Sequence, residues 1–433
     1  MRLEKKITLS RFTVLVALIS GCCFQLSAQE NSPYSRYGLG DPVPTGNIVN
    51  RAMGGISAAY FDYQSINYLN PASYSKLRYT TFDLGFEVDT RTLREPNTAG
   101  KFSASSANVS YIQLGIPLVP KRSWGLNLGL RPTTRVNYKI QTNERLSYDS
   151  LVTIYEGTGG SYDVFAGTGI AFKNLSLGVN IAYTFGTKDY STKKLFLNDS
   201  ILYYQSNHQT KSTFGGFTFQ GGAQYSTQLA KTTWLRLGVT GQLQRTLNAN
   251  RDIIRETFEY DANGGTLRVD SISTLSDISG KVTYPSSFTA GFLIDKQTEW
   301  ALGADFTTTN WTKYQFFGEK DPLQNSWQFK AGGQWTPSQK PGKSYWNYVT
   351  YKGGFFYGRD YIKADRDLPI IGFTAGAALP MRRSNYTNQT TVINTAFEVG
   401  RRGNDQNAIK ENFFRISVGF SLSDIWFRKV KYE

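Results

Sequence analysis

Apolar and polar residues alternate with a period of two over many short stretches of this chain. In residues 175–185 every odd position is apolar or aromatic, whereas the even positions hold Ser, Gly, Asn, Ala and Thr. The stretches 124–131, 235–243 and 414–422 repeat the pattern. Successive side chains of a strand point to opposite faces, so one face suits lipid and the other a polar interior. Apolar and polar residues also alternate in the strands of a soluble β-sandwich, so the lengths of the connections between strands must distinguish the two folds.

The alternation predicts an all-β fold, a transmembrane antiparallel β-barrel of about fourteen strands, an even number as in bacterial barrels. The strands are expected near 80–94, 102–117, 124–139, 160–172, 174–187, 213–228, 232–246, 284–295, 298–312, 325–337, 347–360, 367–380, 390–402 and 411–426.

The joints between these strands alternate in length. Those at 119–123, 173–174, 227–231 and 295–298 are tight, and those at 141–159, 188–212 and 247–282 are long. Short turns on one rim and long loops on the other are typical of outer-membrane barrels, with the turns in the periplasm. The last long segment is expected to hold a hairpin of Ile253–Tyr260 against Gly265–Ile272. Both chain ends are then expected on the periplasmic side.

Residues 1–28 have the pattern of a signal peptide. A basic start precedes a short apolar run, Phe12–Ile19, and a small-residue cleavage site, Leu26–Ala28. The alternative is a lipidated Cys22, because Ile19–Cys22 resembles a lipobox. The expected organisation is 1–28 signal peptide, 29–79 N-terminal plug and 80–433 barrel.

The stretch 50–77 fits neither the signal peptide nor the strands. Gly54 and Gly55 permit a backbone that residues with side chains adopt poorly. Asn70-Pro71 is a turn signal, because the residue before proline avoids helical geometry. We interpret the stretch as a compact plug.

Composition agrees with an exported barrel. The 433 residues include 41 Gly and 15% aromatic residues, and after Ile19 no run of about 18 apolar residues exists. The net charge of +15 is attributed to surfaces facing anionic surroundings, and outer-membrane lipid is an expected partner. A nucleic-acid partner is not expected, because an exported chain without a binding motif meets little nucleic acid.

Candidate catalytic chemistry is lacking in the sequence. His208 is the only histidine, and Cys22 and Cys23 both precede the expected cleavage site. A catalytic triad or a zinc site would need several such residues. We therefore expect no enzyme activity, no cofactor and no metal site.

Charged residues at lumen-facing positions are the informative polar groups. A buried charge is costly without a partner, so these residues are expected to tie the barrel wall to the plug; the alternative is binding a ligand carboxylate or releasing the plug. Asp305 and Lys330 are expected to pair across neighbouring strands, and Arg51 is a natural partner for Glu398 or Asp305. The charged residues that share a strand face with the polar and small residues are Arg131, Arg135, Arg236, Asp305, Lys330, Glu398 and Arg415.

Pro132 interrupts the third expected strand. Proline cannot donate a ladder hydrogen bond and is tolerated only at a bulge or an end. One hypothesis is that Gly129–Pro132 kinks the strand and opens a lateral gap. The alternative is that Pro132 marks the outer edge of the membrane.

The stretch A-M-G-G-I-S-A-A-Y-F-D-Y-Q-S-I-N-Y-L-N-P-A-S-Y resembles the N-terminal signature of FadL/TodX-type (OMPP1-like) outer-membrane transport proteins. The segments 300–311, 327–337 and 372–380 also fit, and the C-terminal tail resembles that of Bacteroidota members. The motif positions that carry the resemblance are Ala52, Gly54, Gly55, Ala59, Asp62, Asn70, Pro71 and Ala72.

The resemblance implies a plugged fourteen-stranded barrel that passes hydrophobic molecules, such as long-chain fatty acids, which leave sideways through a kinked strand. The segment 29–49, which precedes the motif, is longer than the minimal start of a plug in this family. It can fill the lumen more completely or reach a periplasmic partner, so the substrate specificity of the family does not carry over.

Two functions are therefore expected from the sequence. The first is passive uptake of a hydrophobic small molecule by a monomer, gated by the plug. The alternative is a non-transporting barrel that acts as a scaffold or assembly partner. The barrel-assembly machinery is an expected partner in either case. An apolar pocket above the plug would favour transport, and a lumen filled with Tyr, Arg and Glu would favour the scaffold.

Overall fold

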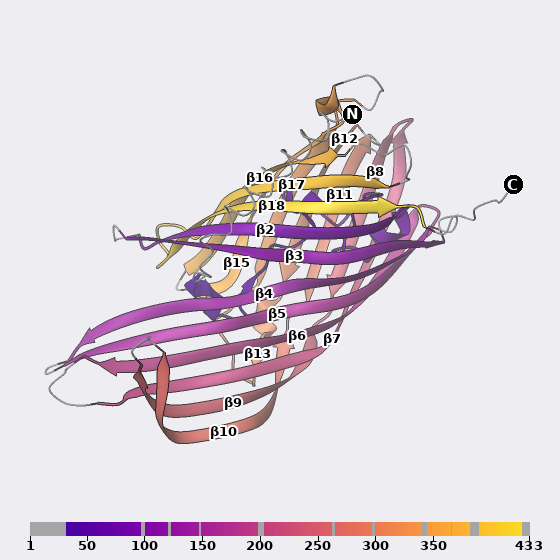
Figure 1. Cartoon of the computed structure of the whole chain (residues 1–433). Coiled ribbons are helices and arrows are strands. Elements are labelled where there is room, and N and C mark those ends of the chain that lie inside the picture. The colour runs from indigo at the N-terminus through magenta and orange to yellow at the C-terminus, as the bar shows by residue number, and fades with distance from the viewer. Residues whose placement is uncertain are drawn as a thin grey trace, which may run out of the picture.

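The described residues of the computed structural model form one antiparallel sheet that closes on itself (Figure 1). These residues are 32–96, 100–119, 123–146, 149–197, 203–261, 265–296, 299–338, 344–364, 366–381 and 389–426. The expected signal peptide, residues 1–28, lies outside them. Among the described residues, no helix has the length and apolar character needed to cross a membrane.

The barrel has fourteen strands, which confirms the predicted fold class and number. Two of these strands are interrupted, so that β8 and β9 together form one barrel strand and β10 and β11 together form the next. The last strand, β18, pairs with the first, β2. The strands are β2 (Thr80–Arg94), β3 (Lys101–Val119), β4 (Trp124–Arg145), β5 (Ser150–Phe172), β6 (Leu175–Phe196), β7 (Gln205–Ala230), β8 (Thr233–Gln242) with β9 (Arg245–Tyr260), β10 (Thr266–Tyr284) with β11 (Ser287–Lys296), β12 (Trp300–Thr309), β14 (Ser326–Trp335), β15 (Thr350–Ala364), β16 (Arg366–Pro380), β17 (Thr390–Arg402) and β18 (Lys410–Asp424).

The period-two pattern places apolar side chains on the outer face of this barrel. In β6, Leu177, Val179 and Ile181 are exposed outward, whereas Ser176 and Asn180 are buried on the inner side. Because lipid surrounds the outer face of a transmembrane barrel, exposed Leu, Val and Ile are stable there.

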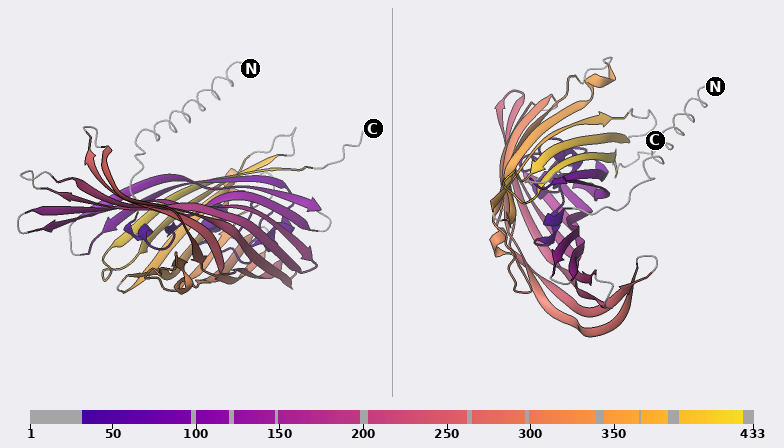
Figure 2. Two further views of the ribbon diagram at one scale, coloured as in Figure 1. Left: turned by 90° about the horizontal axis from the view of Figure 1, so that it is seen from below. Right: turned by 90° about the vertical axis from the view of Figure 1, so that its left-hand side faces the viewer.

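One side of the barrel is much taller than the other. Strands β4 to β7 contain 22, 23, 22 and 26 residues, whereas β12 and β14 contain 10 each. The segments expected to be long loops at 141–159, 188–212 and 247–282 are therefore mostly strand, and the hairpin expected in the last one is β9 with β10. Figure 2 shows the resulting curved wall, which projects past the short strands.

The N-terminal segment, residues 32–79, runs along the inner side of the strands. It contains η2 (Pro33–Arg36), β1 (Asp41–Pro42), α2 (Ile48–Arg51) and η3 (Pro71–Lys76). Tyr34 donates to the Ile409 carbonyl at the loop end of β18, and Gln64 donates to Thr390 at the short-turn end of β17. The segment thus extends from the outer end of the barrel to the periplasmic end. The expectation that its beginning lies on the periplasmic side is wrong for the described residues.

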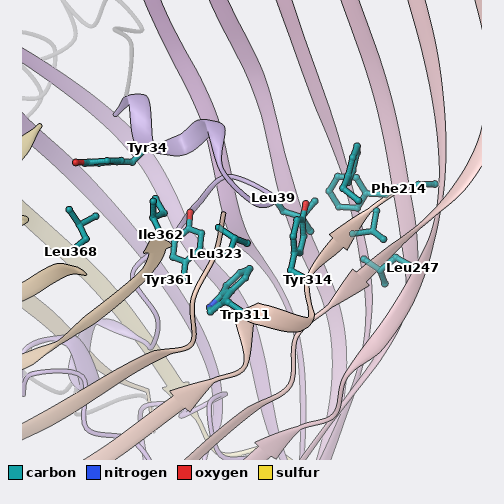
Figure 3. Packing of buried hydrophobic residues seen from close by; sticks show 13 residues of the cluster. Tyr34, Leu39, Phe214, Leu247, Trp311, Tyr314, Leu323, Tyr361, Ile362 and Leu368 are labelled. Carbon is teal, nitrogen blue, oxygen red and sulfur yellow. The ribbon is translucent and has the colours of Figure 1, made fainter. Parts of the chain in front are cut away.

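Aromatic packing holds the outer part of this segment in place. Tyr34 and Leu39 join a buried cluster with Trp311, Tyr314 and Tyr361 from the loops and strands of the short side (Figure 3). Trp311 is 6% exposed in this cluster. Its ring centroid lies 4.6 Å from that of Tyr361. The short side of the barrel therefore packs on the segment at its outer end.

The direction of the N-terminal segment predicts which of its residues face the cell exterior. Arg36 is exposed at the outer end and Tyr63 at the periplasmic end. We expect Arg36→Cys to react with a membrane-impermeant maleimide in intact cells, and Tyr63→Cys to react only after the outer membrane is permeabilised. The parent chain without an added cysteine is the control. Labelling of Tyr63→Cys but not Arg36→Cys in intact cells would contradict this topology.

Candidate functional site

The local structure of the N-terminal segment follows from its capping and turn residues. The Asn47 side chain accepts from the Asn50 N–H at the start of α2, and Asn70 accepts from the Ala72 N–H at the start of η3. Pro71 occupies the first turn of η3, where it removes no hydrogen bond. The Asn70 amide also donates to the Ala58 carbonyl, at 2.6 Å. The predicted Asn-Pro-Ala turn therefore anchors the segment against its own backbone.

Gly54 and Gly55 lie in the left-handed region, with φ of 70° and 85°. A Cβ on Gly54 would lie 2.7 Å from the carbonyl oxygens of Ala331 and Phe355. The Gly54 N–H donates to the Thr374 hydroxyl at 2.8 Å. Glycine is therefore needed here both for the backbone conformation and for close contact with the wall.

Arg51 is the central charge of the site and is 2% exposed. Its guanidinium binds Glu87 of β2 at 2.7 Å and Glu398 of β17 at 3.0 Å. Glu87 also binds Arg135 of β4, and Glu398 also binds Arg415 of β18. Of the two partners expected for Arg51, the structure selects Glu398. One side chain of the N-terminal segment is thereby tied to four barrel strands.

A second clamp holds β1 at the outer side of this network. Asp41 pairs with Arg402 of β17 at 2.8 Å and with Arg91 of β2. Arg402 also forms ion pairs with Asp360 and Glu411. Arg91 also pairs with Asp89, which in turn pairs with Arg415. Burial alone would raise the pKa of the Asp41 carboxyl, but Arg402 and Arg91 outweigh it and hold the pKa well below its usual range. The Asp41 carboxyl is therefore ionised at neutral pH, and its two ion pairs weaken only as pH falls into the acid range.

Asp305 and Lys330 face each other in register on β12 and β14, but they do not form the expected ion pair. The Asp305 carboxylate instead accepts from the Ser57 and Ala58 N–H groups at 2.6 and 2.8 Å. Two converging backbone donors satisfy the buried carboxylate better than one flexible ammonium. Lys330 is 7% exposed and faces the inner cavities.

The remaining predicted charges also contact the N-terminal segment or one another. Arg131 pairs with Asp163 at 3.1 Å and lies over the Tyr68 ring. Arg236 pairs with Asp295 at 2.8 Å and lies over Phe61. Asp62 accepts from the Gln64 N–H and from the Tyr60 hydroxyl.

Sequence reasoning missed the carboxylates that complete these pairs. Asp83, Glu87 and Asp89 of β2 alternate with the outward Leu84, Phe86 and Val88, so the same parity signal could have found them. Asp41 and Glu411 carry no such signal, because each lies at the end of an element.

The barrel wall is discontinuous between β3 and β4. Their ladder runs from Val119–Trp124 to Ile112–Leu130 and stops there, while β4 continues to pair with β5 through a bulge at Pro132–Thr134. Beyond the break, β1 pairs with β4 at Thr134 and Arg135, and the Val43 N–H donates to the Thr133 carbonyl. The N-terminal segment thus replaces β3 as the neighbour of β4. The predicted kink at Gly129–Pro132 coincides with this break.

Cavities lie on both sides of the N-terminal segment. On the outer side, cavities of about 330 and 200 Å³ share Pro42–Thr45 and Lys330 in their linings. On the periplasmic side, cavities of about 890 and 210 Å³ share Asp62, Gln64, Gln334 and Thr350. All four are lined by polar and charged residues as well as apolar ones. None of these four is the continuous apolar pocket expected for a transporter of hydrophobic molecules.

Comparison with known proteins gives one family and a shared fold. A family model described as BamG matches residues 8–433. No curated protein matches the chain in sequence.

Several solved structures are similar to the chain along nearly their whole length. The Pseudomonas putida toluene transporter TodX is 14% identical, with a TM-score of 0.52 and coverage of 89% of this chain and 99% of that chain. A Pseudomonas aeruginosa FadL homologue is 15% identical (TM-score 0.53; 89% and 98% covered). The CymD monoaromatic hydrocarbon channel is 15% identical (TM-score 0.51; 87% and 97% covered). At these identities the likeness establishes the shared fold.

Removal of the central guanidinium should strongly destabilise the barrel. Arg51→Met leaves Glu87 and Glu398 with one fewer cation in a buried site, at an expected cost of about 3–5 kcal/mol. Urea unfolding of the purified protein in detergent, followed by tryptophan fluorescence, measures this cost. The matched control is Lys193→Met, which removes a partly exposed pair with Glu156 and should cost less than about 1 kcal/mol. Equal effects of the two variants would contradict the central role of Arg51.

Proposed function

The chain belongs to the BamG family, and we propose that it is an outer-membrane scaffold whose N-terminal segment fills the lumen, acting with the barrel-assembly machinery. The observation that carries the proposal is the Arg51 network, in which a buried cation of the segment is held by carboxylates of β2 and β17, the two strands that flank β18. Breaking these pairs inside the barrel would leave unpaired buried charges. The segment therefore acts as a permanent part of the structure.

The linings of the cavities and the height of the wall agree with a scaffold. Arginine, carboxylate and tyrosine side chains occupy the centre of the barrel, where a channel for apolar molecules needs an apolar path. The tall side, β4 to β7 with β9 and β10, offers a protein surface beyond the membrane. The family name, BamG, also points to barrel assembly. Export with removal of residues 1–28 belongs to the same proposal.

Depletion of the protein tests the scaffold role. We expect the folded levels of other outer-membrane barrels, measured by heat-modifiable migration on gels, to fall severalfold during conditional depletion. Components of the barrel-assembly machinery should co-purify with the tagged protein at a fixed ratio. Depletion of an unrelated outer-membrane barrel is the control. Unchanged barrel levels together with no co-purification would refute the role.

The break between β3 and β4 favours a second candidate function, passive uptake of a hydrophobic molecule. The outer cavity of about 330 Å³ is lined by Val43, Arg131, Pro132 and Arg245, so it lies beside this break and has cations for a carboxylate. Movement of β1 away from β4 would open a lateral path from the cavity into the membrane. TodX is described as a toluene transporter and has the same fold, which supports this candidate.

Locking β1 to β4 tests the second candidate. Pro42 and Thr134 are register partners, so Pro42→Cys with Thr134→Cys should form a disulfide. For a transporter we expect saturable binding of a labelled long-chain fatty acid that the disulfide abolishes and a reductant restores. Phe288→Cys with Thr308→Cys, a register pair between β11 and β12, is the control. No saturable binding to the wild-type protein would exclude uptake of fatty acids.

A further inference from the structure

Two adjacent periplasmic cavities, which we together call the vestibule, lie at the short-turn end of the barrel. They share lining residues and have volumes of about 890 and 210 Å³. The loop 60–65 of the N-terminal segment forms its inner wall, and the strand ends form its rim. The space is large enough for several amino-acid residues, so a lone small ion would leave most of it empty.

Four cations face this vestibule, and only one of them has a carboxylate partner among the described residues. Arg236 pairs with Asp295, whereas Lys76, Arg78 and Lys352 have no ion pair there. Asp62 is the other carboxylate in the lining, and it accepts from Gln64 and Tyr60. The vestibule therefore carries an excess of positive charge.

Lys352 has no ion pair among the described residues, and Asp62, in the same lining, is the carboxylate whose charge acts on it. Lys352 is 8% exposed and lines the smaller cavity, yet it forms no hydrogen bond with any described residue. Its nearest aromatic contact is the Tyr60 ring, 6.0 Å from the ammonium nitrogen. An unpaired cation in a buried position is costly, and a bound carboxylate would offset that cost.

The other two cations lie over aromatic rings at the mouth. Arg78 lies 4.5 Å from the Tyr63 ring centroid and Lys76 lies 5.9 Å from that of Phe61. Burial and the charges of Arg236 and Arg78 lower the pKa of Lys76, so an anion would relieve this repulsion. The rings add an apolar wall beside the charges, and together they match a chain that carries both carboxylates and apolar side chains.

We propose that this vestibule is a docking site for an extended acidic segment of a periplasmic polypeptide. Carboxylates of that segment bind Lys352, Lys76 and Arg78, and an aromatic side chain packs on Phe61 and Tyr63. The chain's own C-terminal tail starts at the same end after Asp424, but it contains Arg428, Lys429 and Lys431, so its charge opposes this occupancy. The inference does not depend on the scaffold role, because it concerns binding to the isolated protein.

Binding of a defined peptide to the purified full-length protein tests the proposal. The probe is a fluorescein-labelled synthetic peptide that alternates glutamate and phenylalanine, followed by fluorescence anisotropy. We expect saturable binding that weakens as NaCl is raised, because salt screens exposed charges. The same peptide with lysine in place of glutamate should not bind. Absence of saturable binding, or equal binding of the lysine peptide, would overturn the proposal.

Single substitutions locate the binding to the vestibule. Lys352→Gln and Arg78→Gln should each weaken binding about tenfold, the effect of losing one hydrogen bond between charged groups. The matched control is Lys320→Gln, an exposed lysine at the opposite end of the barrel, which should bind as the wild type does. Arg78 is exposed, so its replacement keeps the test valid even where Lys352→Gln fails to fold. Unchanged affinity in Arg78→Gln would overturn the proposal.

A truncated chain separates an external ligand from the chain's own tail. Removal of residues 427–433 should leave peptide affinity within about twofold, since a basic tail and an acidic peptide do not compete for cations. Binding seen only after truncation would mean that the tail occupies the vestibule, and this result would overturn the proposal. Unchanged barrel levels in depleted cells, together with no co-purification, would refute the scaffold role without affecting this result.

Discussion

The need to neutralise one buried guanidinium organises the interior of this barrel. Arg51 is 2% exposed, and a charge removed from water in this way requires carboxylates at hydrogen-bonding distance. Glu87 and Glu398 supply them from different strands, and each is shared with a further arginine. The N-terminal segment, β2, β4, β17 and β18 are therefore linked through alternating charges, so no one of them can shift alone.

A second constraint comes from the unpaired edge of β4. Backbone groups at a strand edge in or near a membrane need partners. The ladder between β3 and β4 ends at Leu130, and β1 supplies the next partners through Thr134 and Arg135. The Asp41 clamp fixes β1 in this place from the other side. The segment therefore occupies the lumen and also forms part of the barrel wall, unlike a plug that only occupies the lumen.

These two constraints separate the ends of the lumen. Ion pairs occupy the centre, and the break in the wall lies toward the outer end. Cations without an ion pair among the described residues face the periplasm. A partner bound at either end would meet the ion-paired centre, in keeping with the proposed scaffold role. An uptake route would instead bypass the centre through the break beside Pro132.

The alternation of apolar and polar residues predicted the number of strands and the lumen-facing charges, because a barrel between lipid and a polar interior imposes a period of two on its strands. It did not predict the full length of β4 to β7, β9 and β10, whose outer parts were expected to be loops. The same parity would have identified Glu87 and Asp89 opposite Phe86 and Val88. The sequence also predicted the unusual backbone at Gly54 and Gly55 and the turn at Asn70, since these conformations depend on local residue types. The three-dimensional structure was needed to establish that Arg51 binds Glu398, that Asp305 binds backbone N–H groups rather than Lys330, and that the segment begins at the outer end. These contacts join residues that are distant in the chain and that meet only when the sheet closes. No local sequence pattern encodes such contacts.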